Sequence, residues 1–302
     1  MNINMLRDTD NDAGFYAAAS GTGGRWPGAV LFLSSDNGAS YQQIATFTSQ
    51  ATIGRVLGTL GDFMGGNIPD EMNSIIVSLE KGALSSVGYA SFLAGAQAAV
   101  IGDEIVLFRS AVLNSDGTYT VSGFLRGQRG SEYAIGTHAP NERFVLVDPT
   151  SFVRVSGVTA DLGMPRLYKA VTSGSTLAKT TAQSFTNAGA GLKPYAPVHV
   201  GGGRDADGNV LIQWVRRSRI SGEWRNNVDV PIGEEAERYE VEIWTADRST
   251  LKRTISGLTS PAATYSAAEQ AADGIAPGTG ISVSVYQLSS IVGRGYEARA
   301  TI

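Results

Sequence analysis

The chain has 302 residues, a formal net charge of −4 and no cysteine. The lack of cysteine excludes disulfides, thiol catalysis and thiolate metal sites, and the charge balance lacks the broad basic face that nucleic-acid binding needs. Hydrophobic residues make up 42%, while 37 glycines and a charged fraction of 17%, against about 25% in a typical domain, favour short strands joined by tight turns.

No segment of the sequence predicts export or membrane insertion. The first ten residues are polar and acidic, without the apolar stretch of a signal peptide. The longest apolar run, residues 92–101, is interrupted by Gly95 and Gln97 and is too short to span a bilayer. We therefore expect a soluble chain without a membrane span, which would leave a cell by a route other than secretion, such as inside a particle.

Residues 1–65 predict an N-terminal β module, with strand-like runs at 15–19, 29–33, 41–48 and 53–60. Between two of these runs, Ser34-Ser-Asp-Asn-Gly-Ala-Ser-Tyr41 resembles an Asp box, the hairpin motif of sialidase propellers. A propeller needs repeated blades, and no second copy occurs at a regular spacing, so a single hairpin is the better interpretation.

Residues 66–150 predict a second β-rich module around one hairpin. Its strands are residues 100–111 and 119–125, and the turn Asn114-Ser-Asp-Gly117 joins them. Asn and Asp tolerate left-handed dihedrals and glycine adopts them freely, which is typical of hairpin turns. Residues 74–79 and 143–148 are further strands, whereas residues 86–98 fit either a short helix or an edge strand.

Residues 151–194 predict a β connector and linker, which ends near Pro194 and Pro197, two residues that favour an extended backbone. Residues 195–302 then predict a β-sandwich, because about seven strand-like runs occupy about 100 residues. In one of these runs apolar and acidic residues alternate, as in a half-buried strand. Trp214, in the second run, is the expected core plug.

The hairpin region also carries a specific residue pattern. It resembles the tail-tip hub proteins of long-tailed bacteriophages and gene transfer agents, in which E-I-x-x-F-R-x-A precedes L-x-G-L-L-R-G-x-R-G-[TS]-E. Only Val121 and Phe124 depart from it, each an apolar residue where relatives often carry Leu. The matching positions are Glu104, Ile105, Phe108, Arg109, Ala111, Gly123, Leu125, Arg126, Gly127, Arg129, Gly130, Ser131 and Glu132.

The C-terminal module resembles fibronectin type III, with an enlarged loop at residues 220–233, and the hub family often ends in such a module. The segments that match are 193–195, 221–224, 238–242 and 285–296. The similarity covers nearly the whole chain and is least specific in residues 1–65. The expected fold is therefore mainly β, with several small antiparallel β domains, the last an immunoglobulin- or fibronectin type III-like sandwich.

The resemblance implies a virion structural protein of a tail tip or baseplate, made in the cytoplasm of a host bacterium, with no catalytic activity, cofactor or metal. The partners it implies are other tail proteins (hub, distal tail, fibre or spike) and further copies of the chain, in a ring or a threefold hub, with a trimer as the expected oligomer. The C-terminal sandwich would face the host surface, where a glycan or an outer-membrane receptor is the expected contact. The chain is either a separate gene product or part of a larger hub polypeptide.

Two roles are open for the arginines of the pattern. Arg126 and Arg129, between glycines, fit an anion site built by converging backbone amides. They fit better as forked hydrogen-bond donors to neighbouring strands or subunits. Arg109, Arg126, Arg129 and Glu132 are thus the interface candidates.

A glycan-binding or receptor-binding module is the alternative function, because Trp26, Trp224 and Trp244 could offer exposed aromatic platforms. Trp244 lies on the acidic face of its strand and is the best of the three. A glycoside hydrolase is less favoured, since it needs two facing carboxyl groups and nothing in the sequence pairs them.

The remaining polar motifs favour structural interpretations. His138 and His199 have no neighbouring ligand or catalytic partner in the sequence, so both are expected at the surface or in turns. Asp205-Ala-Asp-Gly-Asn209 resembles the start of a calcium loop, but Arg216 stands where an EF-hand needs glutamate.

Overall fold

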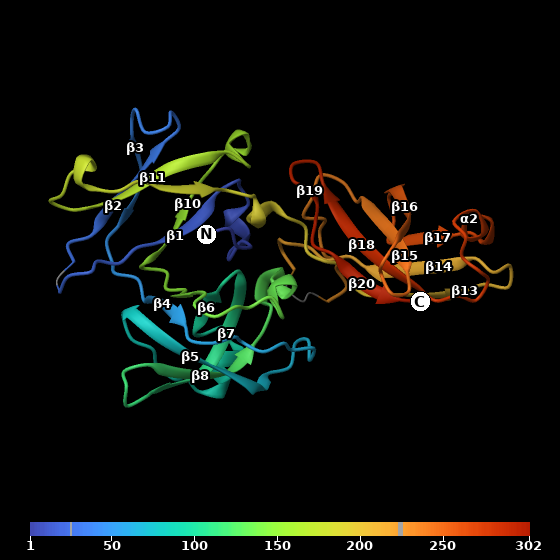
Figure 1. The fold of residues 1–302 in the computed structure, drawn as a ribbon, viewed down its shortest axis with the longest axis horizontal. Helices are drawn as coiled ribbons and strands as arrows, with labels where there is room; N and C mark the ends of the chain where they lie inside the picture. The colour runs from blue at the N-terminus through green and yellow to red at the C-terminus, as the bar shows by residue number, and fades with distance from the viewer. Residues whose placement is uncertain (25, 223–225) are drawn as a thin grey trace. The chain divides into compact units, whose positions relative to one another are not determined.

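The computed structural model describes residues 1–24, 26–222 and 226–302, and antiparallel sheets dominate it (Figure 1). The prediction of a mainly β fold with several small antiparallel sheets is confirmed. The chain forms two compact units: unit 1 comprises Met1–Leu6 and Asp10–Gly191, and unit 2 comprises Arg7–Thr9 and Leu192–Ile302. Short 3-10 turns lie at Asp8–Asp10, Gln128–Gly130, Glu132–Ala134, Thr159–Asp161, Leu177–Lys179 and Ala190–Leu192.

Unit 1 contains two sheets built from both ends of its sequence. A two-stranded sheet pairs β1 with β10, and a four-stranded sheet has the order β12-β11-β2-β3. The bounds are Phe15–Ala18 (β1), Ala29–Ser34 (β2), Gln42–Phe47 (β3), Phe152–Val155 (β10), Pro165–Thr172 (β11) and Gln183–Thr186 (β12). Strands of the expected N-terminal module thus pair with strands of the expected connector. The sequence did not indicate this pairing, because strand partners that are distant along the chain leave no local signal.

The Asp-box segment forms one hairpin turn between β2 and β3. Asp36 accepts hydrogen bonds from the Ser40 hydroxyl (2.6 Å), the Ser40 amide (2.9 Å) and the Ser34 hydroxyl (2.7 Å). These bonds, those of Ser40 first, hold the pKa of Asp36 well below its ordinary value. The motif therefore fixes a turn.

The third sheet of unit 1 is a closed barrel with the strand order β4-β5-β8-β7-β6-β9. Its elements are Ile53–Val56 (β4), Asp70–Lys81 (β5), Ala98–Ile101 (β6), Glu104–Leu113 (β7), Tyr119–Leu125 (β8), Arg143–Leu146 (β9) and the helix Tyr89–Leu93 (α1). The predicted hairpin is present as β7 and β8. β9 closes the barrel by pairing with both β4 and β6.

One glycine changes the face that β8 presents to the barrel core. Gly123 has a φ of +68°, a left-handed conformation that favours glycine. Val121 and Phe124, three residues apart, are consequently both fully buried in the core, although a regular strand would place them on opposite faces. An apolar residue at each of these positions is therefore explained by the kink.

Unit 2 is a sandwich of two antiparallel sheets. One has the order β13-β14-β17, and the other has the order β16-β15-β18-β19, with β20 also paired to β18. The bounds are Val198–Arg204 (β13), Val210–Val215 (β14), Tyr239–Thr245 (β15), Leu251–Leu258 (β16), Ala262–Tyr265 (β17), Ala267–Ala272 (α2), Ile281–Ser289 (β18), Gly293–Arg294 (β19) and Ala298–Thr301 (β20). This is the architecture of an immunoglobulin- or fibronectin type III-like sandwich.

The core of unit 2 lies between its two sheets. Trp214 on β14 is only 4% exposed, and its ring meets that of Tyr239 edge-on, with centroids 5.1 Å apart. The apolar residues of β15 and β18, alternate positions along each strand, complete this core. Trp214 thus lies where the sequence places the core plug.

Candidate functional site

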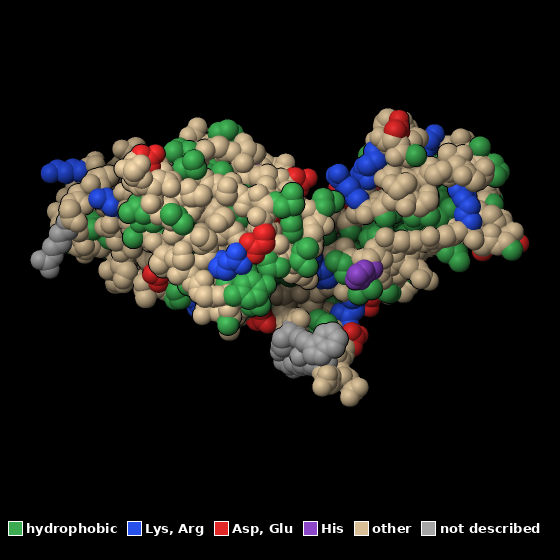
Figure 2. Space-filling model, turned by 90° about the horizontal axis from the view of Figure 1, so that it is seen from below, with side chains coloured by type: hydrophobic (Ala, Val, Ile, Leu, Met, Phe, Trp, Pro, Cys, Tyr) green, Lys and Arg blue, Asp and Glu red, His purple; other side chains and the backbone are tan. Residues whose placement is uncertain are grey.

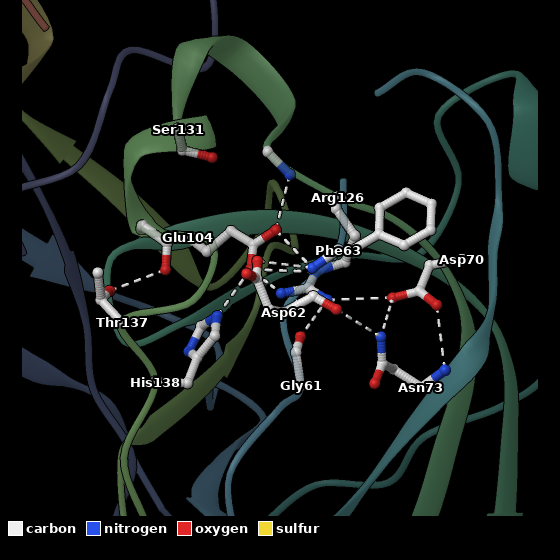
Figure 3. Close-up of polar contacts among 12 residues, drawn as sticks. Gly61, Asp62, Phe63, Asp70, Asn73, Glu104, Arg126, Ser131, Thr137 and His138 are labelled. Carbon is white, nitrogen blue, oxygen red and sulfur yellow. Dashed lines mark hydrogen bonds and ion pairs between the residues drawn. The ribbon is translucent and has the colours of Figure 1, made fainter. Parts of the chain in front are cut away.

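The most distinctive polar arrangement of the molecule is a buried network centred on Arg126 (Figure 3). Arg126 directly follows β8, and its Nε and Nη2 donate to the carboxylate of Glu104 at 2.9 Å each. Its Nη1 donates to Asp70 Oδ2 at 3.1 Å and to the Gly61 carbonyl at 2.9 Å. The side chains of all three charged residues are 0% exposed.

Glu104, the first residue of β7, joins this arginine to a histidine. Its Oε1 accepts the Gly127 amide hydrogen at 2.7 Å, and its Oε2 lies 2.7 Å from His138 Nε2. Burial tends to raise the pKa of Glu104, but hydrogen bonds from His138, Arg126 and the Gly127 amide outweigh it and hold the pKa below its ordinary value. Glu104 is therefore an anion inside the barrel.

His138 bridges two carboxylates. Its Nε2 meets Glu104 and its Nδ1 meets Glu142, each at 2.7 Å. Burial tends to lower the pKa of His138, but the two hydrogen bonds and the two negative charges raise it above its ordinary value. A ring that donates from both nitrogens carries a proton on each, so this geometry favours the imidazolium.

Asp70, the first residue of β5, anchors the opposite side of Arg126. Its Oδ1 accepts the Asn73 amide hydrogen at 3.0 Å, and its Oδ2 accepts from Asn73 Nδ2 at 2.8 Å. Asn73 Nδ2 also donates to the Asp62 carbonyl at 3.1 Å. The network therefore ties together the starts of β5 and β7, the loop before β5 and the turn after β8.

The turn after β8 depends on glycine for its shape. Gly127 has a φ of +60°, and a Cβ there would lie 2.7 Å from Glu132 Cγ and 3.0 Å from Glu132 Cα. In the same turn, the Ser131 hydroxyl accepts the Ile105 amide hydrogen at 2.9 Å and donates to the Gln128 carbonyl at 2.7 Å. The R-G-x-R-G-S-E segment is thus a clasp that closes over the start of β7.

The structure corrects two expectations at this point. Arg126, an interface candidate, is an interior residue, but the forked hydrogen bonds expected of it are present and run to Glu104 and Asp70 on the neighbouring strands β7 and β5. His138, expected at the surface or in a turn, has a side chain only 1% exposed, because both of its nitrogens bond to carboxylates. The partners of Arg126 lie 22 to 65 residues away along the chain and gave no local signal. His138 has one distant partner, Glu104 at 34 residues, and one local partner, Glu142 at four residues, whose spacing was the signal that sequence reasoning missed.

The other interface candidates lie on the surface. Arg109, on β7, donates with both terminal nitrogens to Glu71 at 2.7 Å, and its guanidinium lies 5.6 Å from the Tyr89 ring centroid. Arg129 and Glu132 are exposed on the clasp, where the Arg129 carbonyl accepts a bond from Asn4. The structure does not bring Arg109 into the Arg126 network.

The tryptophans proposed as platforms have different environments. Trp26 is half-buried and packs against the core of the four-stranded sheet. Trp244 is half-buried, donates from Nε1 to Glu242 at 3.2 Å and has the Arg248 guanidinium 5.3 Å from its ring centroid. Trp224 lies outside the described residues. The Arg248 guanidinium therefore covers part of the Trp244 ring that a glycan would contact.

Other candidate chemistry is sparse in the described part of the chain. Within residues 1–24, 26–222 and 226–302, no cluster of three or more His, Asp or Glu side chains is arranged to hold a metal ion. Asp205 caps its own turn by accepting the amide hydrogens of Asp207 and Asn209. The helices in these ranges are too short or too polar to cross a membrane.

Comparisons with known proteins bear on the barrel. Residues 51–145 match the family model described as Rcc01698-like, C-terminal. That segment coincides with the barrel, whose strands run from Ile53 to Leu146. No curated protein matches the sequence.

Among solved structures, the chain is similar to the FN1–FN3 domains of chicken CNTN1, with 10% identity, a TM-score of 0.26 and coverage of 97% of this chain and 94% of that one. It is also similar to the central fibronectin-III array of RIM-binding protein, with 14% identity, a TM-score of 0.19 and coverage of 82% and 68%. Neither score indicates a shared overall arrangement.

Proposed function

We propose that this chain is a structural protein of the tail tip of a phage or phage-like particle, where it assembles with other tail proteins. The observation that carries the proposal is the match of residues 51–145, the barrel, to the Rcc01698-like, C-terminal family, a name associated with gene transfer agents. The residue pattern that resembles tail-tip hub proteins lies in the same segment. Its members Glu104, Arg126, Gly127 and Ser131 hold the barrel together.

A structural role fits the chemistry of the network. Both oxygens of Glu104 and both oxygens of Asp70 accept hydrogen bonds from protein groups. The charged side chains of the network are zero to one per cent exposed, apart from Glu142, which is 21% exposed. A catalytic acid or base must reach a substrate proton, so an internal and satisfied network favours shape over catalysis.

The barrel surface fits a protein that assembles with others. Met64 and Met72 are 92% and 91% exposed, and Ile68 is 61% exposed, all in or beside the loop before β5. Figure 2 shows acidic, basic and apolar side chains interspersed over both units on the face drawn there. Exposed methionines together with Tyr89 and Arg109 have the composition of protein interfaces. The proposed partners are the hub, distal tail, fibre or spike proteins and further copies of this chain.

The proposal is tested by locating the chain in particles. Particles are purified from cells that make the chain with a C-terminal nanogold-binding tag, and electron microscopy records where the gold lies. Gold at the distal end of the tail is the expected result. A chain that mass spectrometry finds free in the lysate and absent from purified particles overturns the proposal.

A matched pair of variants links the location to the barrel. Glu104→Gln, which weakens the buried network, is expected to reduce incorporation of the chain into particles. Asp116→Asn changes an exposed carboxylate in the turn between β7 and β8 of the same barrel, and it is expected to leave incorporation unchanged. Equal incorporation of both variants would show that the buried network of the barrel is not needed for assembly into particles.

A further inference from the structure

Unit 1 contains an open groove of about 670 Å³ along the edge of β1. This volume falls in the range of ligand sites, about 300–1,000 Å³. All five consecutive residues from Phe15 to Ala19 line it. Successive residues of a strand point to opposite faces, so a groove lined by five in a row runs along the strand edge.

β1 has an edge at this groove that the chain's own Met1 covers at Tyr16 and leaves uncovered at Ala18. Among the strands of residues 1–24, 26–222 and 226–302, β1 pairs with β10 alone, with Tyr16 opposite Arg154 and Ala18 opposite Phe152. The Tyr16 carbonyl accepts a bond from the Met1 amino group instead of from β10. Backbone groups of antiparallel strands alternate in direction, so the amide and carbonyl of Ala18 also point away from β10.

The sheet of β1 and β10 is a middle layer of unit 1 (Figure 1). On one side, Phe15 and Ala17 pack with Leu31 and Phe47 of the four-stranded sheet. On the other, Tyr16 and its neighbours pack with residues of the barrel wall. Two strands are fewer than the three or more that give a sheet independent stability, so the groove lies where a third strand of this layer would fit.

The two walls of the groove differ in chemistry. The wall of the four-stranded sheet is apolar and aromatic, with Leu31, Phe47 and Tyr168, and the Tyr168 ring meets that of Phe15 edge-on at 5.5 Å. The barrel wall presents Arg55 and Arg143, which are direct partners on β4 and β9.

The two arginines keep hydrogen-bonding capacity for a ligand. Arg55 has Glu80 at 3.6 Å and Arg143 has Asp103 at 3.7 Å, and the two arginines donate to the carbonyls of Asn141 (3.1 Å) and Gly102 (2.7 Å) respectively. A guanidinium has five N–H donors and these side chains are 60% and 42% exposed, so N–H groups remain for a ligand. Among the charged side chains that line the groove, two are these arginines and one is Glu80.

We infer that this groove binds an extended peptide segment of a partner protein, which adds to the part of the β1 edge at Ala18 that Met1 leaves uncovered and alternates apolar with acidic residues. Apolar side chains face Leu31 and Tyr168, and acidic side chains face Arg55 and Arg143. The backbone of the segment bonds to Ala18, which is how peptides add to sheet edges. The inference rests on the proposed function only in naming a neighbouring tail protein as the source of the segment.

The test uses the full chain and a fluorescein-labelled five-residue peptide that alternates valine and glutamate. Fluorescence anisotropy is expected to show saturable binding. The peptide with lysine in place of glutamate is expected to bind at least about tenfold more weakly, because hydrogen bonds to charged groups are lost. A peptide with a central proline, which removes a backbone donor, is expected not to bind.

Variants of the chain test the role of the arginines on the barrel wall. Arg55→Gln with Arg143→Gln is expected to weaken binding of the glutamate peptide about tenfold and to leave a valine–glutamine peptide unaffected. Arg299→Gln, an exposed arginine of unit 2, is the charge-matched control and is expected to change nothing. Circular dichroism checks that each variant is folded.

Disulfide trapping provides a second measurement, because the chain has no cysteine. Ala18→Cys is expected to capture a valine–glutamate peptide with a central cysteine, while Ser290→Cys, an exposed control in unit 2, is not.

Equal binding of the glutamate, lysine and proline peptides overturns the inference. Complete displacement of the peptide by polygalacturonate also overturns it, because the groove would then be a polysaccharide site. Failure here leaves the location of the chain in particles untouched, so the two proposals fail separately.

Discussion

The barrel of unit 1 and the sandwich of unit 2 are both small antiparallel structures, but they place their charges differently. The barrel buries Arg126 with Glu104 and Asp70 at 0% exposure. The sandwich fills the space between its sheets with aromatic and aliphatic side chains around Trp214. Its buried ion pair, Arg219 with Glu234, lies between β14 and β15 in sequence and not in that core, and Arg294, which pairs with Glu240 and Glu242, is 41% exposed. A buried ion pair costs desolvation and stabilises only when every partner is present. The two regions should therefore respond to different kinds of change.

The largest expected effect is in the barrel. Arg126→Met leaves Glu104 and Asp70 buried without their main counter-charge, which should cost about 3–5 kcal/mol of unfolding free energy. Hydrogen exchange measured by mass spectrometry should show the loss in β5 and β8 and not in β15 and β18. Arg109→Met is the matched control in the same barrel, because its exposed pair with Glu71 should contribute about 1 kcal/mol or less. Equal losses in the two variants would contradict the role of the buried network.

The corresponding change in the sandwich is Trp214→Ala. Removing this nearly buried ring should cost about 3 kcal/mol through lost burial and the cavity left behind. Exchange should rise in β15 and β18 while β5 and β8 keep their protection. Trp244→Ala, at a half-buried site on the outer face, should cost less. If Trp244→Ala lowered the free energy of unfolding as much as Trp214→Ala, the core would not be the main source of stability in the sandwich.

Two turn glycines sharpen the comparison at a smaller scale. Gly127→Ala places a Cβ at a left-handed φ and 2.7 Å from Glu132, so it should cost about 2 kcal/mol. Gly208, in the β13–β14 turn, has a φ of +81°, but its Cβ would meet nothing nearer than 3.8 Å. Gly208→Ala should therefore cost about 1 kcal/mol, from strain alone. Urea unfolding followed by exchange in each unit measures both losses, and a larger loss for Gly208→Ala would contradict the crowding of the clasp.

The smallest expected effect is a dependence on pH that is confined to the barrel. The raised pKa of His138 means that its contribution is complete below the ordinary pKa of 6.5 and is lost as pH rises through the higher folded-state pKa. Protection factors in β7 and β9 should therefore decrease above pH 6.5. The lowered pKa of Glu104 acts in the opposite direction: its contribution is present above the ordinary 4.5 and is lost as pH falls through the folded-state value.

His138→Gln provides the control for this dependence. It keeps a hydrogen-bonding side chain but removes the titration, so the decrease above pH 6.5 should disappear. β15 and β18, which contain no histidine, serve as the internal reference. A decrease that persists in His138→Gln would assign the pH dependence to another group.

The candidate site was only half visible in the sequence. Glu104, Arg126 and Gly127 stand in a pattern that can be read directly, and adjacency on a strand already places Asp103 and Glu104 on opposite faces. The structure shows Glu104 inside and Asp103 exposed. Asp70 carried no such signal, because its contact with Arg126 joins residues 56 apart along the chain. His138 carried half of one, because Glu142 stands four residues away and Glu104 stands 34 residues away.

The sequence by itself determined the local structure of this protein: the turns at residues 34–41 and 114–117, the alternation along β15 and the placement of Trp214 in a core strand. These features depend on backbone preferences and on the spacing of apolar residues, which neighbouring residues encode. Only the tertiary structure decided that β9 closes a barrel, that β1 pairs with β10 across more than a hundred residues, and that Arg126 and His138 are interior residues. Strand partners and buried charges are selected by packing in three dimensions, and distance along the chain does not limit which groups meet.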